Sequence, residues 1–377
     1  MALDLAGRTM TYRDLSALID AVRLPERGLV VVDASDPVAT LVTVLAVQRR
    51  QRPVAVGPPG FTDWPSNLPT GTDLIAVTSG TTGQPRPVAR SWPSWSRSFA
   101  ALTSFTGLTA ADRILLTGPL FSTLHLFGAL HTFALGAALT DRPERADAAH
   151  LVPTVLARLL DRPRSELPLR RVVVAGDRLP DYLAAGAADR GIDVVEYYGA
   201  AELSFVALRR PPDAFRAFPG VAVQVRENLL WARSDYLSLG YAGGVSGPMR
   251  RDADGFATVG DRGELTPDGS ILLSGRAEEA ITTGGHTVLV ADIEAALRRL
   301  PGVADAAAVG LPHQRLGQVV AAVVVLAPGT ELSRLRRSAR QQLSGPALPR
   351  RWLARDRLPV TAAGKLARAA LAAEFPT

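Results

Sequence analysis

The 377-residue sequence contains no cysteine, which excludes thiol nucleophiles, disulfides and cysteine-ligated metal sites. It also lacks a long apolar run, because the most apolar stretch, residues 29–47, is interrupted by Asp33 and Asp36 and is too polar to span a bilayer. The N-terminus has no basic segment followed by an apolar core, so no signal peptide is expected. These absences predict a cytoplasmic protein with no membrane partner.

Lysine is nearly absent. The 42 basic residues comprise one lysine, Lys365, and therefore 42 − 1 = 41 arginines. A general bias toward arginine explains most of this count. A lysine survives most readily, however, where a compact ammonium cannot be replaced by a bulky planar guanidinium. The surroundings of Lys365 are therefore a candidate site of chemistry.

The formal net charge of +6 and the pI of about 10.2 raise the question of a nucleic-acid partner. The basic residues are scattered, in runs no longer than two, and aromatic residues do not alternate with them as in single-strand binders. We therefore expect no nucleic acid, and the charge is better suited to attracting polyanionic cofactors. A chain of 377 residues is also too long for one comfortable core, which predicts two or more domains.

A loop rich in glycine and hydroxyl groups follows the strand predicted at residues 74–77. Glycines let successive backbone N–H groups approach an anion, and the hydroxyl groups add donors for phosphate oxygens. The spacing does not match the G-x-x-x-x-G-K-[ST] loop of kinases and GTPases. A plain surface turn of Ser, Thr and Gly is the alternative. The candidate phosphate-binding residues are Thr78, Ser79, Gly80, Thr81, Thr82, Gly83 and Arg86.

Strand, helix and strand follow one another within residues 29–56, which implies a parallel α/β sheet. In the N-terminal region, helices are expected to begin at Thr11 and at Asp36. After residue 290, predicted helices at 292–300 and 333–343 flank two predicted strands, which indicates a compact α+β unit.

Four further motifs occur in a fixed order. Residues 198–202 resemble Y-G-x-T-E, residues 258–261 resemble T-G-D, and residues 275–281 resemble G-R-x-[DE]-[DE]-x-I. Residues 358–368 contain every fixed position of L-P-x-T-x-x-G-K-x-x-R. Together with the loop, these motifs resemble the AMP-forming adenylating superfamily, which contains acyl-CoA synthetases, adenylation domains and luciferases.

The resemblance implies an α/β fold with two domains. A large N-terminal domain, residues 1–275, would contain mixed, mainly parallel sheets with flanking helices. A small, mobile α+β domain, residues 276–377, would rotate about a hinge at Glu278. Only 77 residues precede the phosphate loop, fewer than is typical of the family, so the first subdomain is expected to be shortened.

The resemblance also assigns roles to individual residues. Lys365 would bridge the acid's carboxylate and the α-phosphate of ATP, and Glu202 would bind Mg²⁺, which prefers carboxylate oxygens. Tyr198 would stack on adenine, and Asp261 would accept hydrogen bonds from the ribose hydroxyls. The remaining residues expected to bind ATP or AMP are Gly176, Asp177, Gly199, Ala200 and Arg276.

His125 lies in an H-x-x-G element with Gly128, which in the family borders the acyl pocket near the carboxylate. We therefore include His125 among the catalytic candidates with Lys365 and Glu202. A structural histidine with a hydrogen bond in the core is the alternative. The other histidines considered, His131, His150 and His313, are assigned surface or packing roles.

The sequence departs from the family pattern at three positions: Arg86 replaces a lysine, Pro87 a glycine and Ala201 a threonine. Guanidinium and ammonium groups are not interchangeable, so loop closure or nucleotide affinity could differ. The alanine removes one hydroxyl from the phosphate site.

The function implied is an AMP-forming carboxylic acid–CoA ligase that uses ATP and Mg²⁺, with coenzyme A as co-substrate. The stretch from hinge to helix looks most like short bacterial aryl-acid–CoA ligases, such as o-succinylbenzoate–CoA ligases, which favours a small aromatic acid. In a first alternative, the adenylate is transferred to a carrier protein, an amine or another nucleophile. In a second, suggested by the three departures, the protein only binds nucleotide. The intact Gly364-Lys365 motif argues against that second alternative.

Overall fold

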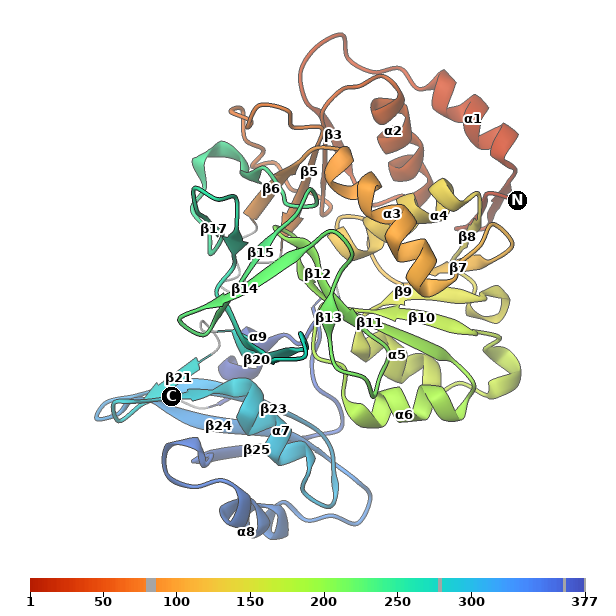
Figure 1. The fold of residues 1–377 in the computed structure, drawn as a ribbon. Helices are drawn as coiled ribbons and strands as arrows, with labels where there is room; N and C mark the ends of the chain where they lie inside the picture. The colour runs from red at the N-terminus through yellow and green to blue at the C-terminus, as the bar shows by residue number, and fades with distance from the viewer. Residues whose placement is uncertain (79–85, 277–279, 362–363, 376–377) are drawn as a thin grey trace.

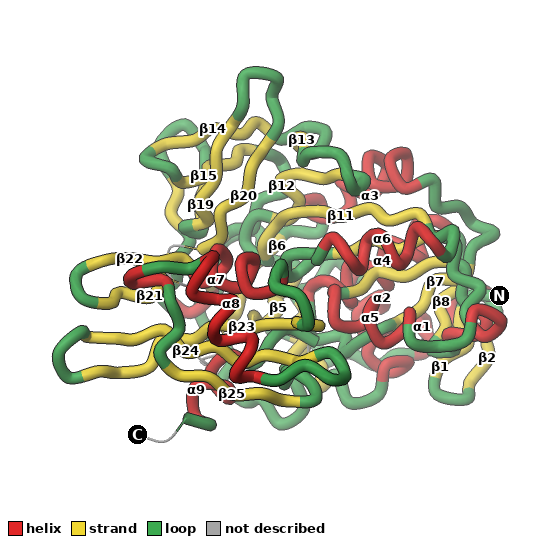
Figure 2. Tube along the Cα trace, turned by 90° about the horizontal axis from the view of Figure 1, so that it is seen from below, coloured by secondary structure: helices red, strands yellow, loops and turns green. Residues whose placement is uncertain are grey.

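The computed structural model describes residues 1–78, 86–276, 280–361 and 364–375. These residues form a large domain and, beneath it in Figure 1, a small domain that ends with the C-terminus. Figure 2 shows the strands β21 to β25 of the small domain in a sheet of their own. Within the described ranges, every helix is too short or too polar to cross a membrane.

A nine-stranded sheet is the centre of the large domain, in the order β13-β12-β11-β10-β9-β7-β8-β1-β2. Its strands from β1 through β8, β7, β9 and β10 to β11 run parallel. They are short runs of buried apolar residues, as expected for strands covered on both faces. The strands are β1 (Leu3–Leu5), β2 (Arg8–Met10), β7 (Arg113–Leu116), β8 (Ala138–Thr140), β9 (Ala148–Leu151), β10 (Arg171–Val174), β11 (Asp193–Ala200), β12 (Ser204–Arg209) and β13 (Arg216–Ala217).

Helices cover both faces of this sheet (Figure 1). Neighbouring residues of one strand point to opposite faces, so that Ala148 packs in the core beneath α4 and Ala149 in the core beneath α5 and α6. The helices of the large domain are α1 (Tyr12–Ala21), α2 (Pro37–Arg49), α3 (Pro93–Thr106), α4 (Thr123–Leu135), α5 (Pro153–Leu160) and α6 (Asp181–Asp189). Short 3₁₀ helices occur at Pro143–Arg145, Arg164–Glu166, Ala242–Gly244 and Gly345–Ala347.

The predicted helix starts are confirmed, and capping explains them. Thr11 and Asp14 form a capping box at the start of α1. The carboxylate of Asp36 accepts hydrogen bonds from the backbone N–H groups of Val38 and Ala39, and Pro37 occupies the first turn of α2.

Two further sheets complete the large domain. In the first, β3, β4 and β5 run parallel as predicted, and β6 returns antiparallel to β5. Its strands are β3 (Val30–Asp33), β4 (Val54–Gly57), β5 (Leu74–Thr78), β6 (Arg86–Arg90) and β16 (Gly240–Tyr241). The second is antiparallel and consists of β14 (Ala222–Arg226), β15 (Leu229–Arg233), β17 (Arg250–Arg251), β18 (Ala257–Thr258), β19 (Asp261–Leu265) and β20 (Ile271–Arg276).

The small domain is the predicted α+β unit, built on a long hairpin of β23 and β24. Its helices α7 and α8 pack on one face of the sheet through Ile293, Leu297 and Leu335. The strands are β21 (Ala280–Thr283), β22 (His286–Leu289), β23 (Val303–His313), β24 (Gly317–Leu326) and β25 (Arg351–Arg355), and the helices are α7 (Val290–Arg298), α8 (Leu332–Gln342) and α9 (Arg368–Ala373). The proposed boundary at residue 275 falls near the end of β20, and Glu278 lies outside the described residues.

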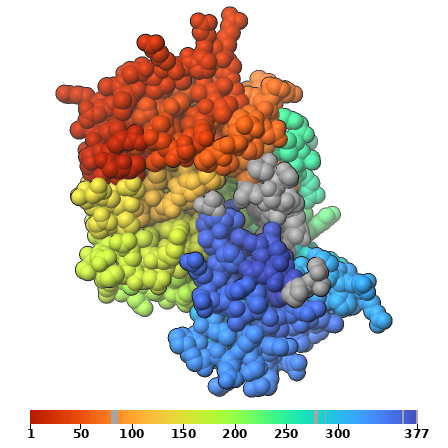
Figure 3. Space-filling model, turned by 180° about the vertical axis from the view of Figure 1, so that it is seen from behind, coloured from red at the N-terminus to blue at the C-terminus, as the bar shows by residue number. Residues whose placement is uncertain are grey.

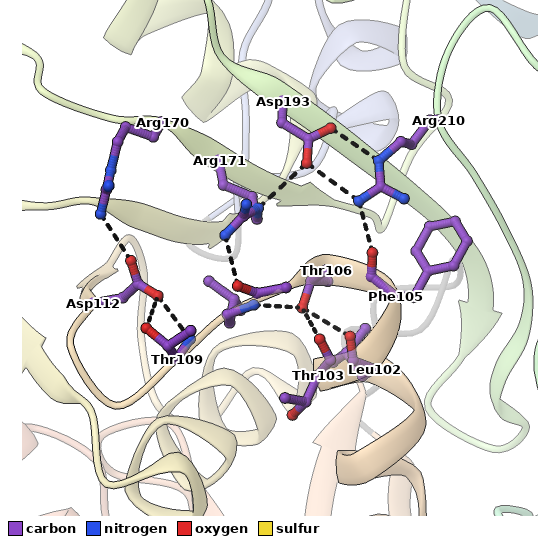
Figure 4. Close-up of polar contacts among 12 residues, drawn as sticks. Leu102, Thr103, Phe105, Thr106, Thr109, Asp112, Arg170, Arg171, Asp193 and Arg210 are labelled. Carbon is purple, nitrogen blue, oxygen red and sulfur yellow. Dashed lines mark hydrogen bonds and ion pairs between the residues drawn. The ribbon is translucent and has the colours of Figure 1, made fainter.

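Arginines join α3 to the amino edge of the nine-stranded sheet (Figure 4). Arg171 at the start of β10 and Arg210 after β12 both pair with Asp193 at the start of β11, at 3.3 and 3.0 Å. The same two guanidinium groups donate to the carbonyls of Gly107 and Phe105 at the end of α3. These two arginines thus have a structural use at the amino edge of the sheet.

Candidate active site

Two of the predicted site residues, Gly176 and Glu202, lie just after the carboxyl ends of β10 and β11 in the nine-stranded sheet. Gly118 and Val152 follow the corresponding ends of the neighbouring strands β7 and β9. In open α/β sheets this edge is where ligands bind. The edge is therefore the candidate active site.

Lys365 reaches this edge from the small domain. A Cβ atom on Gly176 would lie 3.3 Å from the Cε atom of Lys365 and 3.2 Å from Cγ1 of Val152. The hydroxyl of Thr154 in α5 donates a hydrogen bond of 2.5 Å to the carbonyl of Gly364. Figure 3 shows the C-terminal segment, in dark blue, against the yellow-green part of the large domain. The two domains therefore meet with the single lysine at the strand ends.

The C-terminal motif forms a tight turn that presents this lysine. The backbone N–H of Thr361 donates to the carbonyl of Lys365 at 2.7 Å, and that of Gly364 donates to the carbonyl of Thr361 at 2.8 Å. Gly364 has a φ of +79°, and a Cβ there would lie 2.8 Å from Val152, so glycine is required on both counts. The motif's arginine, Arg368, pairs with Glu294 of α7 and anchors the turn within the small domain.

Glu202, the predicted Mg²⁺ ligand, is 7% exposed and lies in the turn after β11, two residues beyond its last residue, Ala200. Its Oε1 atom accepts a hydrogen bond of 2.8 Å from the hydroxyl of Tyr241. Burial, and then the nearby Glu202 charge, raise the pKa of Tyr241, so this phenol remains a donor. Among the described residues no group of three or more His, Asp or Glu side chains could hold a metal. A buried carboxylate nevertheless fits Mg²⁺, which is commonly held by one or two carboxylates and substrate phosphates.

Tyr198 and Asp261, predicted to contact adenine and ribose, lie together in the structure. The Tyr198 hydroxyl donates a hydrogen bond of 2.7 Å to Oδ2 of Asp261, which is 5% exposed. The pairing of β11 with β12 is interrupted by a bulge at Gly199, directly after Tyr198. A Cβ atom on Gly199 would lie 2.0 Å from the Ser204 carbonyl oxygen. Only glycine permits this close approach of two backbone segments. The bulge bends β11 just before the turn that contains Glu202.

Profiles of known families match both parts of the chain. The profile of AMP-binding enzymes matches residues 23–229, and that of the AMP-binding enzyme C-terminal domain matches residues 292–365. The chain belongs to the AMP-binding enzyme family. The predicted family is thereby confirmed.

Several relatives of this AMP-binding enzyme are acyl-CoA ligases. An uncharacterized acyl–CoA ligase, YhfT of Bacillus subtilis, is 30% identical over 78% of this chain and 67% of its own length. Indoleacetate–CoA ligase of Aromatoleum aromaticum is 28% identical over 78% of this chain and 65% of its own length. Feruloyl-CoA synthase of an Amycolatopsis species is 29% identical over 93% of this chain and 80% of its own length. The predicted enzyme class, an AMP-forming, ATP-dependent acid–CoA ligase, is confirmed.

Solved structures confirm the predicted fold class. A variant of E. coli MenE with bound OSB-AMS superimposes with a TM-score of 0.85 at 22% identity, covering 99% of this chain and 94% of that one. At this level of identity the likeness concerns the fold alone.

His125 begins the buried face of α4 and is 2% exposed. Its ring packs over Gly118, where a Cβ atom would lie 2.3 Å from the ring carbon Cε1. The pKa of His125 is lowered to about 4, mainly by burial, while the Pro119 carbonyl acts to raise it and the Lys365 ammonium to lower it by smaller amounts. The nearby Pro119 carbonyl does not meet either ring nitrogen in regular hydrogen-bond geometry, so neither nitrogen has a well-formed partner among the described residues.

The phosphate loop is described only at its two ends. The Thr78 hydroxyl donates to the Arg86 carbonyl at 3.4 Å, where β5 and β6 pair. Asp177 is exposed in the turn after β10, across from Arg298 of the small domain. The predicted residues that lie outside the described part are Ser79, Gly80, Thr81, Thr82, Gly83 and Glu278, and the side chain of Arg276 is not described either.

Arg90 is a residue that the sequence analysis did not identify. It is fully buried at the end of β6, and its guanidinium donates to the carbonyls of Ala201 and Tyr236. Burial lowers the pKa of Arg90 to about 9, and the charge of Glu202 opposes this change. The available signal was an arginine directly after the apolar run Pro87-Val88-Ala89, where a side chain is expected to be buried.

Proposed function

We propose that this AMP-binding enzyme joins a small aromatic carboxylic acid to coenzyme A, with Lys365 as the catalytic ammonium. In the first step a carboxylate oxygen attacks the α-phosphorus of ATP, and the bond to pyrophosphate breaks. In the second step the sulfur of coenzyme A attacks the acyl carbon and AMP leaves. The observation that carries the proposal is the contact of the Lys365 side chain with Gly176, at the strand ends where Glu202 and His125 also lie.

The role proposed for Lys365 follows from charge. The carboxylate and the α-phosphate are both anions and repel one another as they approach. One ammonium group between them can neutralise charge on both, at a preorganised position that costs no rearrangement. The turn of Thr361 to Lys365 and the Thr154 hydrogen bond hold the ammonium there.

The roles proposed for Glu202, Tyr198 and Asp261 follow from burial and position. Glu202 would hold Mg²⁺, which when bound neutralises phosphate charge. Tyr198 would hold adenine with its ring, while its hydroxyl fixes Asp261 for the ribose. Each of these side chains stands on a strand end or on the turn after one, which is a rigid support.

The second step requires that Lys365 leave the site. We propose rotation of residues 276–377 about Glu278, so that Gly284 and Gly285 in the turn between β21 and β22 face the thiol. The Thr154–Gly364 hydrogen bond must break in this motion. A single hydrogen bond contributes about 1 kcal/mol, so it does not lock the domains together.

An aromatic acid is favoured by aromatic side chains of α3, α4 and β12, which lie in the core on the α4 side of the nine-stranded sheet. Trp95, Phe127 and Phe205 form a contiguous layer with ring centroids 5.6 and 5.0 Å apart. Such a layer can pack against an aromatic ring. Two relatives, indoleacetate–CoA ligase and feruloyl-CoA synthase, are named for aromatic acids.

The test is pyrophosphate release from ATP with aromatic, fatty and small acids, first without and then with coenzyme A. We expect release with at least one aromatic acid and a thioester once coenzyme A is present. Lys365→Ala should lower release by at least about 10²-fold while ATP still binds. Arg357→Ala, which removes an exposed cation nearby, is the matched control.

Three results would contradict parts of the proposal. Full activity of Lys365→Ala would remove its catalytic role. Release without any thioester would indicate a different acceptor. No release with any acid would indicate a protein that only binds nucleotide.

A further inference from the structure

We propose that His125 and His150 form a subsite that binds one hydroxyl group of the carboxylic acid. The inference rests on the proposed function, since the acid must first occupy the site at Lys365. It goes further by naming a chemical group that the acid carries. His150 lies in β9, directly under α4, and is 3% exposed.

The two imidazoles have four ring nitrogens, and none of the four makes a well-formed hydrogen bond with a described residue, although the Pro119 carbonyl lies near the His125 ring. Buried polar atoms in folded proteins are almost always paired with protein or ordered water, so four at one place mark a site for a hydrogen-bonding group that the chain itself does not supply. The third buried histidine, His131, differs because its Nε2 lies 2.9 Å from the Thr103 hydroxyl. The unmet hydrogen-bonding capacity is therefore concentrated at His125 and His150.

The two rings border one small cavity of about 10 Å³ between α4 and strands β7, β8 and β9. A space of this size holds about one oxygen atom with its hydrogens. The Thr117 hydroxyl also borders the cavity, but it already donates to the His150 carbonyl at 2.7 Å. The histidine nitrogens are therefore the groups in need of a partner.

Two glycines make this arrangement possible. A Cβ on Gly128 of α4 would lie 3.0 Å from Cβ and Cγ of His150, and a Cβ on Gly118 would overlap the His125 ring. Larger residues at either position would push the rings away from the cavity. The backbone is thus shaped to bring two imidazoles under one helix.

The chemistry of the rings favours a hydroxyl over an ion. Burial lowers the pKa of His125 to about 4 and that of His150 to about 3, so both are neutral at pH 7. A neutral imidazole has one donor and one acceptor nitrogen. A hydroxyl can donate to one ring and accept from the other, whereas a carboxylate can only accept and an ammonium can only donate.

His150 lies two residues before Val152, and Val152 borders the same Gly176 position that the Lys365 side chain approaches. The charge of Lys365 acts on His125, which borders the cavity. An acid whose carboxylate lies at Lys365 would then place a hydroxyl of its own near His125. A related acid without the hydroxyl cannot make these hydrogen bonds with the rings, which disfavours it by roughly tenfold to a hundredfold.

The experiment compares kcat/KM for pyrophosphate release with benzoate and its three monohydroxy forms, and with cinnamate and its three monohydroxy forms. In the wild-type enzyme we expect one hydroxylated acid to exceed its parent by at least tenfold. His150→Phe should bring that ratio toward one, and His150→Gln should restore part of it. His313→Phe, at an exposed histidine, should leave the ratio unchanged.

The wild-type comparison decides the question even where a variant fails to fold. Equal rates for every hydroxylated acid and its parent would overturn the subsite and leave the ligase function standing. An unchanged ratio in a folded His150→Phe variant would do the same. No pyrophosphate with any acid of the wider panel would overturn both.

Discussion

The phenol oxygen of Tyr198 lies 2.7 Å from Oδ2 of Asp261, so two residues that are 63 positions apart act as one unit. Asp261 begins β19 in the antiparallel sheet, and Tyr198 lies near the end of β11 in the nine-stranded sheet. The hydrogen bond therefore ties two sheets together at the place proposed for the nucleoside.

Tyr198→Phe should separate the two contributions of this tyrosine. The ring is retained, so adenine stacking should survive, but Asp261 loses a hydrogen-bond donor. We expect the KM for ATP to rise several-fold and the free energy of unfolding to fall by about 1 kcal/mol. Steady-state kinetics and urea unfolding measure the two effects. Tyr182→Phe, at an exposed tyrosine, is the control, and equal behaviour of the two variants would contradict the assignment.

Gly364→Ala should lower the rate of adenylation strongly, while its effect on the free energy of unfolding should be small by comparison. The new Cβ would press on Val152 and move Lys365, and small displacements of catalytic groups cost roughly ten- to a hundredfold in rate. Gly329→Ala is a matched control, since Gly329 has nearly the same φ of +78° but nothing within 4 Å of an added Cβ. Pyrophosphate release should fall only in the first variant, and an equal fall in both would refute the contact.

Arg90→Met should destabilise the protein by roughly 2–6 kcal/mol, because two carbonyl groups lose their partners at about 1–3 kcal/mol each. The loss should also lower activity, since one of those carbonyls belongs to Ala201, next to Glu202. Urea unfolding with pyrophosphate release provides both measurements. Arg97→Met, at an exposed arginine, should change stability by less than about 0.5 kcal/mol. A stable, active Arg90→Met protein would show that the buried guanidinium is dispensable.

Glu202→Gln should raise the Mg²⁺ concentration needed for half-maximal pyrophosphate release by about tenfold or more, since a ligating carboxylate loses its charge. The amide oxygen can still accept from Tyr241, so folding should change little. Titration of Mg²⁺ after treatment with a chelator gives the measurement. Tyr241→Phe controls for loss of that hydrogen bond alone. An unchanged Mg²⁺ requirement in Glu202→Gln would place the metal elsewhere.

The free energy of unfolding should fall as the pH is lowered from 7 to 5. Burial lowers the pKa values of His125 and His131 to about 4 and that of His150 to about 3. Below the unfolded value of about 6.5 the unfolded chain takes up protons that the folded protein does not, which favours unfolding. Each histidine should contribute about 2 kcal/mol over this interval.

Urea unfolding at pH 7 and at pH 5 tests this expectation. His131→Gln should reduce the pH dependence by about one histidine's share, whereas His313→Gln, at an exposed position, should not change it. The same pH dependence in all three proteins would show that the buried imidazoles titrate normally.

Local features of the fold were predictable because they depend on neighbouring residues. Thr11 and Asp36 cap α1 and α2 where capping residues predict helix starts. The helix expected at residues 333–343 is α8, Leu332–Gln342, one residue earlier at each end. Alternation after residue 290 indicated the α+β unit, although α7 begins two residues earlier than predicted, at Val290.

The sequence by itself determined the family, the order of the motifs and the importance of the single lysine, since these depend on residue type and spacing along the chain. Only the tertiary structure decided that His150 lies beside His125 and that Arg90 lies behind Ala201. His150 and Arg90 belong to no motif, and each meets partners from distant elements. Such contacts arise from how strands and helices pack, and no pattern of near neighbours encodes them.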